Sequence, residues 1–194
     1  MTRSTHFGGD PAVEGQPMQA RPLATERPIP EGWQPDLNAT LLFIVREGEI
    51  LLIHKKRGLG AGKLNGAGGK VDPGETTLEA AMREFQEELR ARPVAPRKLG
   101  EVAFEVLSGM SILIHVFRAD ELEGEPVETD EATPLWTPVD DVPYDRMWED
   151  DRHWLPHVIE DRPFEAYARF QGDDMVDCRV ALFPDPDRLP WESR

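Results

Sequence analysis

The sequence predicts a domain of the α/β (α+β) class, an α/β/α sandwich with a mixed central sheet. Short apolar runs typical of strands occur both before and after an amphipathic segment at residues 76–89. A second, shorter helical segment begins near residue 150. Strands on both sides of a central helix, followed by another helix, are typical of a sheet that helices cover on two faces. A length of 194 residues suits one such domain with additional tails.

The predicted strands are apolar or alternating runs bounded by turn residues. They cover residues 40–45, 50–54, 102–107, 112–117, 135–137, 164–170 and 175–182. The first run, Leu41–Val45, is apolar throughout, as expected of a strand buried on both faces, and Glu47–Gly48 turns it into a hairpin. Ser108–Gly109 and Gly172 mark two further hairpin turns.

Two helices are expected between these strands. Thr76 and Glu79 have the spacing of a capping box, which places the start of the first helix at Thr76 or Thr77. The apolar residues at helical spacing predict one buried stripe; they are Leu78, Ala81, Met82, Phe85 and Leu89. The second helix is expected to start at Asp150 or Asp151, with Trp154 on its buried side.

The two ends of the chain differ from the domain between them. Residues 1–36 are rich in proline and glycine with almost no apolar periodicity, so we expect a disordered or loosely attached extension. Trp33 either pins the end of this extension to the domain or is exposed. Residues 37–183 form the predicted domain, and residues 184–194 an irregular tail.

Composition narrows the classes of function. Thirty-seven Asp and Glu against 22 Lys and Arg give a net charge of −15, which argues against a nucleic-acid partner because such binding relies on basic residues. The single cysteine, Cys178, excludes an internal disulfide and is expected to be a structural thiol in a strand. Without a long apolar run or a secretory segment, the chain is expected to be a soluble, cytoplasmic monomer with no membrane partner.

The first helix carries the most informative side chains. At helical spacing Glu84, Glu87 and Glu88 share a face beside the apolar stripe, where like charges repel unless a cation lies among them. Carboxylate oxygens favour Mg²⁺ or Mn²⁺. A solvated acidic face is the better interpretation of such a motif alone. The Gly-rich segment at residues 65–70, just before the helix, instead favours a metal site, since glycines let backbone groups come close to a metal or phosphate.

The stretch from Gly69 to Glu88 resembles the Nudix box. Five residues separate Gly69 from Glu75, and seven more lead to the run R-E-F-Q-E-E. The pattern departs only at its end, where Arg90 and Ala91 replace a glycine and an aliphatic residue. The resemblance implies a Nudix-type fold and hydrolysis of a nucleoside diphosphate derivative. The departure concerns how the helix ends, not the chemistry.

The resemblance also implies roles for individual residues. The metal ligands would be the Gly68 carbonyl, Glu84, Glu87, Glu88 and Glu131. Arg83 would orient Glu87, and Glu75 would brace the loop or reach a metal through water. A water would attack the α-phosphorus and release pyrophosphate. Its general base is left open among Glu87, Glu88 and Glu131.

Outside the box, the chain resembles the branch of the family that hydrolyses oxidised purine nucleoside triphosphates of the 8-oxo-dGTP type. This likeness runs from about Thr40 to Leu182, and its late motifs include Met147–Trp148 and Ala168–Gly172. It implies that Trp148 stacks on the purine. It also implies that Asn65, Asp150 and Asp151 bond the edge of the base, and that Thr40, Lys55 and Phe104 line the pocket. Pocket positions that are bulky in that branch are occupied here by Leu59, Leu64, Ile112 and Ala132.

Alternatives remain at this stage. Asp150 and Asp151 would also suit the N-terminus of a helix, where acids are favourable. In a closed pocket, adjacent carboxylates resist double ionisation, so that one donates and the other accepts a hydrogen bond. The substrate could instead be ADP-ribose, a dinucleoside polyphosphate, NADH or capped RNA. A non-catalytic Nudix module is disfavoured because all the carboxylates of the box are present.

Overall fold

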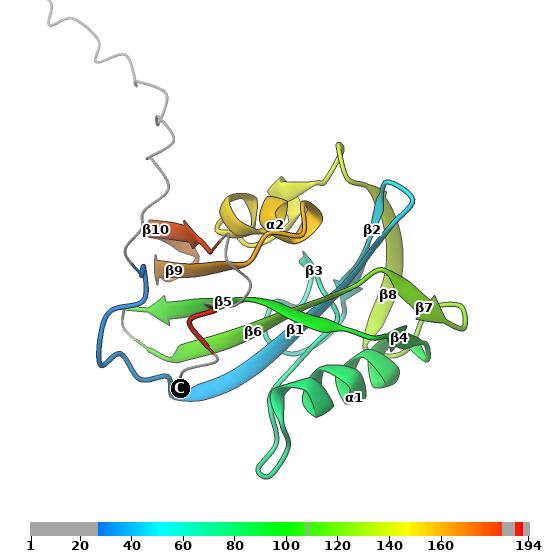
Figure 1. Cartoon of the computed structure of the whole chain (residues 1–194), viewed down its shortest axis with the longest axis horizontal. Helices are drawn as coiled ribbons and strands as arrows, with labels where there is room; N and C mark the ends of the chain where they lie inside the picture. The colour runs from blue at the N-terminus through cyan, green and yellow to red at the C-terminus, as the bar shows by residue number, and fades with distance from the viewer. Residues whose placement is uncertain (1–26, 108, 184–188, 192–194) are drawn as a thin grey trace, which may run out of the picture.

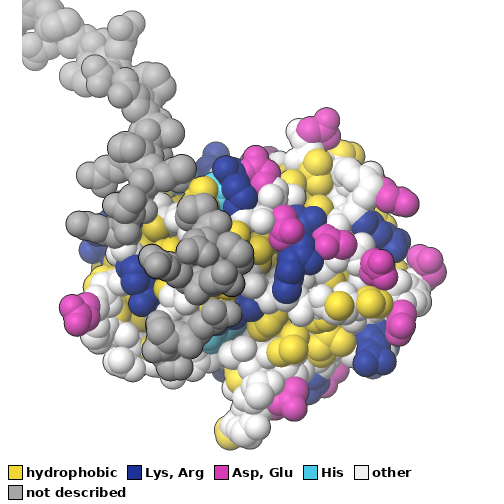
Figure 2. All heavy atoms as spheres, in the orientation of Figure 1, with side chains coloured by type: hydrophobic (Ala, Val, Ile, Leu, Met, Phe, Trp, Pro, Cys, Tyr) yellow, Lys and Arg dark blue, Asp and Glu magenta, His cyan; other side chains and the backbone are white. Residues whose placement is uncertain are grey.

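The computed structural model describes residues 27–107, 109–183 and 189–191 (Figure 1). Residues 1–26 of the predicted extension, the turn residue Ser108, and residues 184–188 and 192–194 of the predicted tail lie outside the described residues. Within them, neither α-helix is long and apolar enough to cross a membrane. On the face shown in Figure 2, acidic and basic side chains are interspersed.

A mixed sheet of eight strands forms the centre of the domain, and a separate two-stranded sheet lies beside it. The main path runs β10-β9-β5-β6-β1-β2-β3, and β8 also pairs with β2. Two pairings, β1 with β6 and β5 with β9, are parallel. The predicted fold class is confirmed. The strands are β1 (Leu37–Arg46), β2 (Glu49–Lys55), β3 (Leu64–Asn65), β4 (Arg92–Val94), β5 (Arg97–Val106), β6 (Ser111–Ala119), β7 (Glu121–Glu123), β8 (Ala132–Pro138), β9 (Phe164–Gln171) and β10 (Asp174–Leu182).

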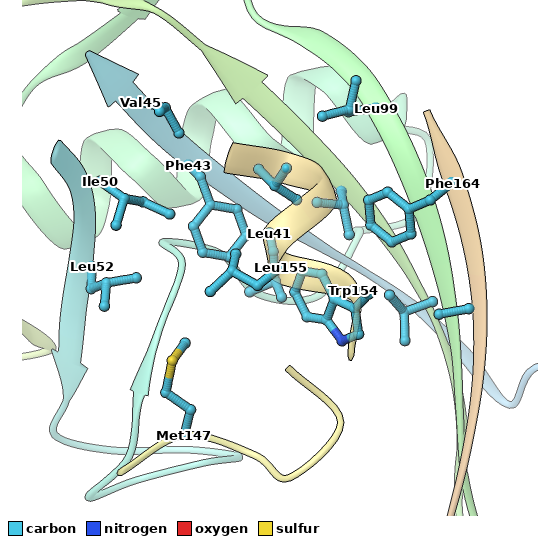
Figure 3. Close-up of a cluster of buried hydrophobic side chains, with 14 of the residues drawn as sticks. Leu41, Phe43, Val45, Ile50, Leu52, Leu99, Met147, Trp154, Leu155 and Phe164 are labelled. Atoms are coloured by element: carbon cyan, nitrogen blue, oxygen red, sulfur yellow. The ribbon is translucent and has the colours of Figure 1, made fainter. Parts of the chain in front are cut away.

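Two helices, α1 (Thr77–Leu89) and α2 (Asp151–Ile159), cover opposite faces of this sheet (Figure 1). Successive residues of a strand point to opposite faces. Accordingly, Leu42 of β1 packs in the cluster that contains Phe85 of α1, whereas Phe43 packs with Trp154 of α2. Figure 3 shows Trp154 and Leu155 among the side chains of the second cluster. The expected all-apolar strand is therefore buried from both sides.

The first helix begins as predicted and differs in two details. Thr76 and Glu79 form both hydrogen bonds of a capping box. Leu78, expected in the buried stripe, is instead 42% exposed, because it lies in the first turn and the buried part of the helix begins at Ala80. At the other end Arg90 has a left-handed backbone, with φ of 58°, at the position where the Nudix box has glycine.

Residues 27–36 pack on the sheet. Ile29 is buried in a cluster with Leu113 and Tyr167, and the Trp33 ring lies edge-on to Tyr167 with centroids 6.4 Å apart. The guanidinium of Arg27 pairs with the buried carboxylate of Glu165. This segment covers the part of the α1 face that α1 leaves open, so the packed domain begins before residue 37.

Candidate active site

The Gly-rich segment lies directly against β1. The Thr40 amide donates to the Gly69 carbonyl at 2.8 Å, and the Leu42 amide donates to the Ala67 carbonyl at 2.7 Å. A Cβ atom on Gly68 would lie 1.9 Å from the Thr40 carbonyl oxygen, and one on Gly69 would lie 2.5 Å from the Glu84 carboxylate. Only glycine permits this approach of the segment to β1 and to the acidic helix.

Helix α1 directs Glu88 into this contact. The Glu88 carboxylate is 1% exposed; it accepts a hydrogen bond from the Gly68 amide at 2.8 Å and another from Lys55 Nζ at 2.8 Å. Burial raises the pKa of Glu88, and the neighbouring Lys55 ammonium opposes that rise. Lys55 Nζ also donates to the Gly68 carbonyl at 2.9 Å, so one ammonium joins two of the predicted metal ligands.

The remaining predicted ligands also have cationic partners. Arg83 pairs with Glu84 at 2.8 Å and with Glu87 at 3.4 Å, and Arg57 pairs with Glu131 at 2.7 Å. Arg83 therefore contacts Glu87, as the sequence predicted, but its shorter contacts are with Glu84 and Glu75.

Glu75 braces the loop before the helix. Its carboxylate accepts from the Asp72 amide at 3.1 Å and from Arg83 Nε at 2.7 Å. The hydrogen bond from Arg83 is the main reason that the pKa of Glu75 falls to about 2. The loop and the acidic helix are thus held together through one arginine.

The chemistry of these oxygens fits a divalent metal ion. Carboxylate and carbonyl oxygens are the ligands that Mg²⁺ prefers. Among the described residues no three acidic, His or Cys side chains converge as a ready-made metal cage, because the glutamates point to Arg and Lys partners. A metal ion bound here would therefore take over contacts now made by Lys55, Arg57 and Arg83.

A cavity of about 480 Å³ connects this acidic cluster with an aromatic pocket. Gly68, Glu84, Glu88 and Glu131 line one part of it. The wall also contains all seven residues predicted to bind the substrate, namely Thr40, Lys55, Asn65, Phe104, Trp148, Asp150 and Asp151. Arg83 and Glu87 lie outside the lining. Met110 and Ile114 line the cavity as well, and no motif in the sequence had indicated them.

Of the four positions expected to enlarge the pocket, only two reach it. Leu59 and Ile112 line the cavity. Leu64 and Ala132 are instead buried in the two hydrophobic clusters on either side of the sheet. The smaller side chains at positions 64 and 132 therefore change the packing of the core and not the shape of the cavity.

Aromatic rings hold Trp148 at the cavity wall. The Phe104 ring lies 5.3 Å from the Trp148 ring and the Phe170 ring 5.7 Å from it, both nearly perpendicular to the indole. Phe104 and Phe170 stack on each other at 4.6 Å. Edge-to-face contacts of this kind fix the orientation of a ring.

The two adjacent aspartates are buried beside this ring. Asp150 accepts from the Trp154 indole N–H at 3.0 Å, and Asp151 accepts from the Trp148 amide at 3.0 Å. Burial raises the pKa of Asp150 to about 6. Burial, reinforced by the charge of Asp150, raises the pKa of Asp151 well above its ordinary value. Asp150 occupies the N-cap position of α2 but makes no capping hydrogen bond, so its side chain is available to the cavity.

Two polar atoms of the cavity wall are unsatisfied. Within the described part of the chain, Thr40 Oγ1 and Asp150 Oδ1 are buried without a hydrogen-bond partner. Leaving a buried polar atom unpaired costs about 1–3 kcal/mol. The arrangement is therefore typical of a site in which a ligand supplies the missing partners.

Cys178 lies close to this pocket. It packs in the cluster that contains Phe104 and Trp148. Burial raises the pKa of its thiol to about 12, so it stays protonated near neutral pH. The environment suits the structural thiol expected from the sequence.

The mixed sheet between two helices and the glycine segment against an acidic helix agree with the comparisons with known proteins, which show that the chain belongs to the Nudix family. The model of the NUDIX domain matches residues 35–158. The oxidized purine nucleoside triphosphate hydrolase of Danio rerio is 44% identical over 138 residues, which are 71% of this chain and 88% of the relative. The protein of the same name from Mus musculus is 36% identical over the same shares of both chains.

A solved structure supports the same assignment. The crystal structure of the mMutator MutT protein from Bacillus halodurans superposes with a TM-score of 0.67 at 26% identity. The superposition covers 77% of this chain and 99% of the other. Nudix hydrolases generally use a divalent metal ion.

Proposed function

We propose that the protein is a Nudix hydrolase that converts oxidised purine nucleoside triphosphates, of the 8-oxo-dGTP type, to the monophosphate and pyrophosphate. One observation carries this proposal. A single cavity joins the acidic cluster of α1 to a pocket lined by Trp148, Asn65 and the two buried aspartates. A nucleotide has the matching pair of ends, a triphosphate and an aromatic base. The printed names of the two vertebrate relatives agree with this substrate class.

The acidic end would hold Mg²⁺, or Mn²⁺ in its place. Its ligands would be the Gly68 carbonyl, Glu84, Glu87, Glu88 and Glu131. The bound metal would polarise phosphate oxygens and lower the pKa of the attacking water.

The hydrolysis would then proceed by attack of this water, with carboxylates of the site accepting its proton. Water oxygen bonds to the α-phosphorus, the bond to the bridging oxygen breaks, and pyrophosphate leaves with that oxygen. The proton of the water passes to a carboxylate, with Glu87, Glu88 and Glu131 as candidates. Arg83, fixed by Glu75, would keep Glu84 and Glu87 in place.

The other end of the cavity would recognise the base. Trp148 presents a ring held by Phe104 and Phe170, on which a purine would stack. A neutral Asp151 would donate a hydrogen bond and an ionised Asp150 would accept one from a ring N–H. Asn65 would bond the remaining edge, and Thr40 Oγ1 offers an unpaired hydroxyl.

We also propose that the enzyme is a monomer. We infer a cytoplasmic role in clearing damaged nucleotides from the precursor pool before DNA synthesis uses them, which would serve the same end as DNA repair.

Pyrophosphate release from 8-oxo-dGTP and from dGTP, each measured with Mg²⁺ and with EDTA, tests the proposal. We expect turnover that requires the metal and strongly favours the oxidised nucleotide. Equal turnover of both nucleotides would remove the base assignment. No turnover of either would turn the search to other nucleoside diphosphate derivatives.

A further inference from the structure

The loop between β2 and β3 connects the two ends of the cavity. Three backbone hydrogen bonds close it into a compact turn: Gly62 to the Lys55 carbonyl at 2.8 Å, Lys63 to the Gly60 carbonyl at 3.0 Å, and Lys55 to the Lys63 carbonyl at 3.1 Å. At one end of the loop, Lys55 reaches the acidic cluster. The other end, with Lys63, lies against the aromatic pocket.

Lys63 sits over the Trp148 ring. Its Nζ atom lies 4.8 Å from the ring centroid, within the range of a cation–π interaction. Gly60, in the same loop, is so close to the indole that a Cβ atom there would lie 3.2 Å from Trp148 Nε1. Among the described residues that line the cavity, Trp148 is present and both Gly60 and Lys63 are absent. Gly60 and Lys63 therefore meet the indole outside the cavity, although Arg57, Gly58 and Leu59 of the same loop line the cavity.

Trp148 is thus supported from several directions. Phe104 and Phe170 contact it at steep angles, and Lys63 covers the outer face. The face toward the cavity remains for a ligand. A cation on the outer face draws electron density from the indole, which favours stacking of an electron-rich oxidised purine on the inner face.

The charge of Lys63 also acts on the edge of the pocket. It opposes the burial that raises the pKa of the Asp151 carboxyl. The same ammonium thus lies near the ring that would stack on the base and near a carboxyl that would bond its edge. A lysine whose only role was to expose its charge to solvent would not need to lie over this ring.

We propose that Lys63 is a positioning residue for the base, which holds Trp148 in its stacking orientation and adjusts the inner face of the indole to oxidised purines. This inference rests on the proposed function, because it assumes that a purine occupies the cavity. It assigns no contact between Lys63 and the substrate. Its effect should therefore appear in affinity for the base and not in the rate of the chemical step.

The experiment compares Lys63→Met, which keeps the length of the side chain without its charge, with Lys63→Arg, which keeps a cation. Arg46→Met is the matched control, since Arg46 lies 4.7 Å over the Trp136 ring, outside the cavity lining. The measurements are KM and kcat for 8-oxo-dGTP, and the Kd of 8-oxo-dGMP by tryptophan quenching without metal. Thermal unfolding shows that each variant is folded.

We expect Lys63→Met to raise KM and the Kd of 8-oxo-dGMP about three- to tenfold with kcat nearly unchanged. Lys63→Arg should restore both, and Arg46→Met should match the wild type. Wild-type affinity in a folded Lys63→Met variant would overturn the inference, and so would an equal loss of affinity in Lys63→Arg. In either case, activity of the wild-type enzyme on 8-oxo-dGTP would still support the proposed function. If the wild type neither binds nor hydrolyses the oxidised nucleotide, the proposed function itself fails.

Discussion

Asp150 and Asp151 show how burial, together with a neighbouring charge, determines the chemistry of a side chain. Both are 2% exposed, and adjacent carboxylates in such a place resist ionising together. One neutral and one ionised oxygen then form a donor and an acceptor side by side. That combination complements an oxidised guanine, whose edge offers both N–H groups and a carbonyl oxygen.

This pair predicts a pH dependence of base binding. The pKa of Asp150 is about 6, whereas the pKa of Asp151 is raised well above its ordinary value. Below pH 6 both would be protonated and the acceptor would be lost. Affinity for 8-oxo-dGMP should therefore increase as the pH rises from about 5 to about 7 and then level off. Calorimetric titration without metal measures this, which keeps the glutamates of the metal site out of the result.

Asp150→Asn is the decisive variant for that titration. Its amide does not ionise, so binding should be weak and flat across the same pH range. A wild-type-like slope in Asp150→Asn would assign the dependence to another group.

The Glu88 side chain gives a second prediction at this scale. Glu88→Gln would remove one charge from the buried oxygen cluster, and we expect metal-dependent turnover to fall by more than about 100-fold. Glu79→Gln on the same helix is the control, because glutamine also completes a capping box and Glu79 is not among the residues that line the cavity. Steady-state pyrophosphate release checks both. A Glu88→Gln enzyme that kept most of its turnover would refute the metal assignment.

Among single residues, the sequence indicated those that belong to a motif. Trp148 and Asn65 followed from the family resemblance, and Glu88 followed from its spacing. The wall positions Met110 and Ile114 could not be found in this way. Met110 lies in the turn before β6, and nothing local distinguishes a strand residue such as Ile114 that faces a cavity from one that faces the core. Lys63 stands among basic residues beside the Gly-rich segment that could attract a polyanionic substrate, but its contact with Trp148 could not be predicted because the two residues lie far apart in the chain.

At the scale of elements, the sequence predicts where α1 begins better than how it ends. The capping box fixes Thr77 as the first helical residue. At the C-terminal end Arg90 adopts the left-handed conformation that glycine adopts without steric strain. The left-handed turn at the end of this helix thus forms although glycine is absent.

Arg90→Gly should therefore stabilise the protein. The left-handed conformation costs a non-glycine residue roughly 1–2 kcal/mol, and part of this is offset by the greater freedom of glycine in the unfolded chain. We expect a gain of about 0.5–1 kcal/mol, which is a rise of a few degrees in Tm for a chain of this size. Differential scanning calorimetry measures it, with Ala91→Gly as a control at a buried neighbouring position that should lose stability. A lower Tm in Arg90→Gly would show that the arginine side chain stabilises the turn.

Each predicted strand is present and α2 starts as predicted, but β5 already begins at Arg97 and β8 at Ala132, before the predicted residues 102 and 135. The shortest strands were not predicted. β3 has two residues, and β4 and β7 have three each. Segments this short cannot show a period of two, and only pairing with a distant strand makes them β-structure. The pairing of β4 with β7 joins segments on either side of β5 and β6, which no local pattern encodes.

At the scale of the whole molecule, the sequence could not show where the packed domain begins. Proline-rich composition predicted a loose extension to residue 36, yet Ile29 is 7% exposed and Trp33 contacts Tyr167. The reason is tertiary. Helix α1 covers only part of its face of the sheet, and the open part, with Leu113 and Tyr167, binds the preceding segment.

Two truncations measure this contribution. A chain that starts at residue 37 should be less stable than one that starts at residue 27 by several kcal/mol. Removing a buried Ile side chain alone costs about 2–5 kcal/mol, and the shorter chain also loses the partner that Arg27 provides to Glu165. Urea unfolding of both chains gives the difference. Equal midpoints would show that residues 27–36 contribute nothing, and Ile29→Ala in the full chain provides an independent check.

The parallel pairing of β1 with β6 has a consequence for how the chain folds during synthesis. Leu37 of β1 lies beside Ile112 of β6, about 75 residues later in the chain. At roughly 5–20 residues per second, a ribosome needs about 4–15 s to make that stretch. During this time the hairpin partner β2 covers only the end of β1, at residues 44–46. The Gly-rich segment can pair with Thr40 and Leu42 on the same edge, but the other edge of this apolar strand stays unpaired until β6 is made and can pair with another chain in that time.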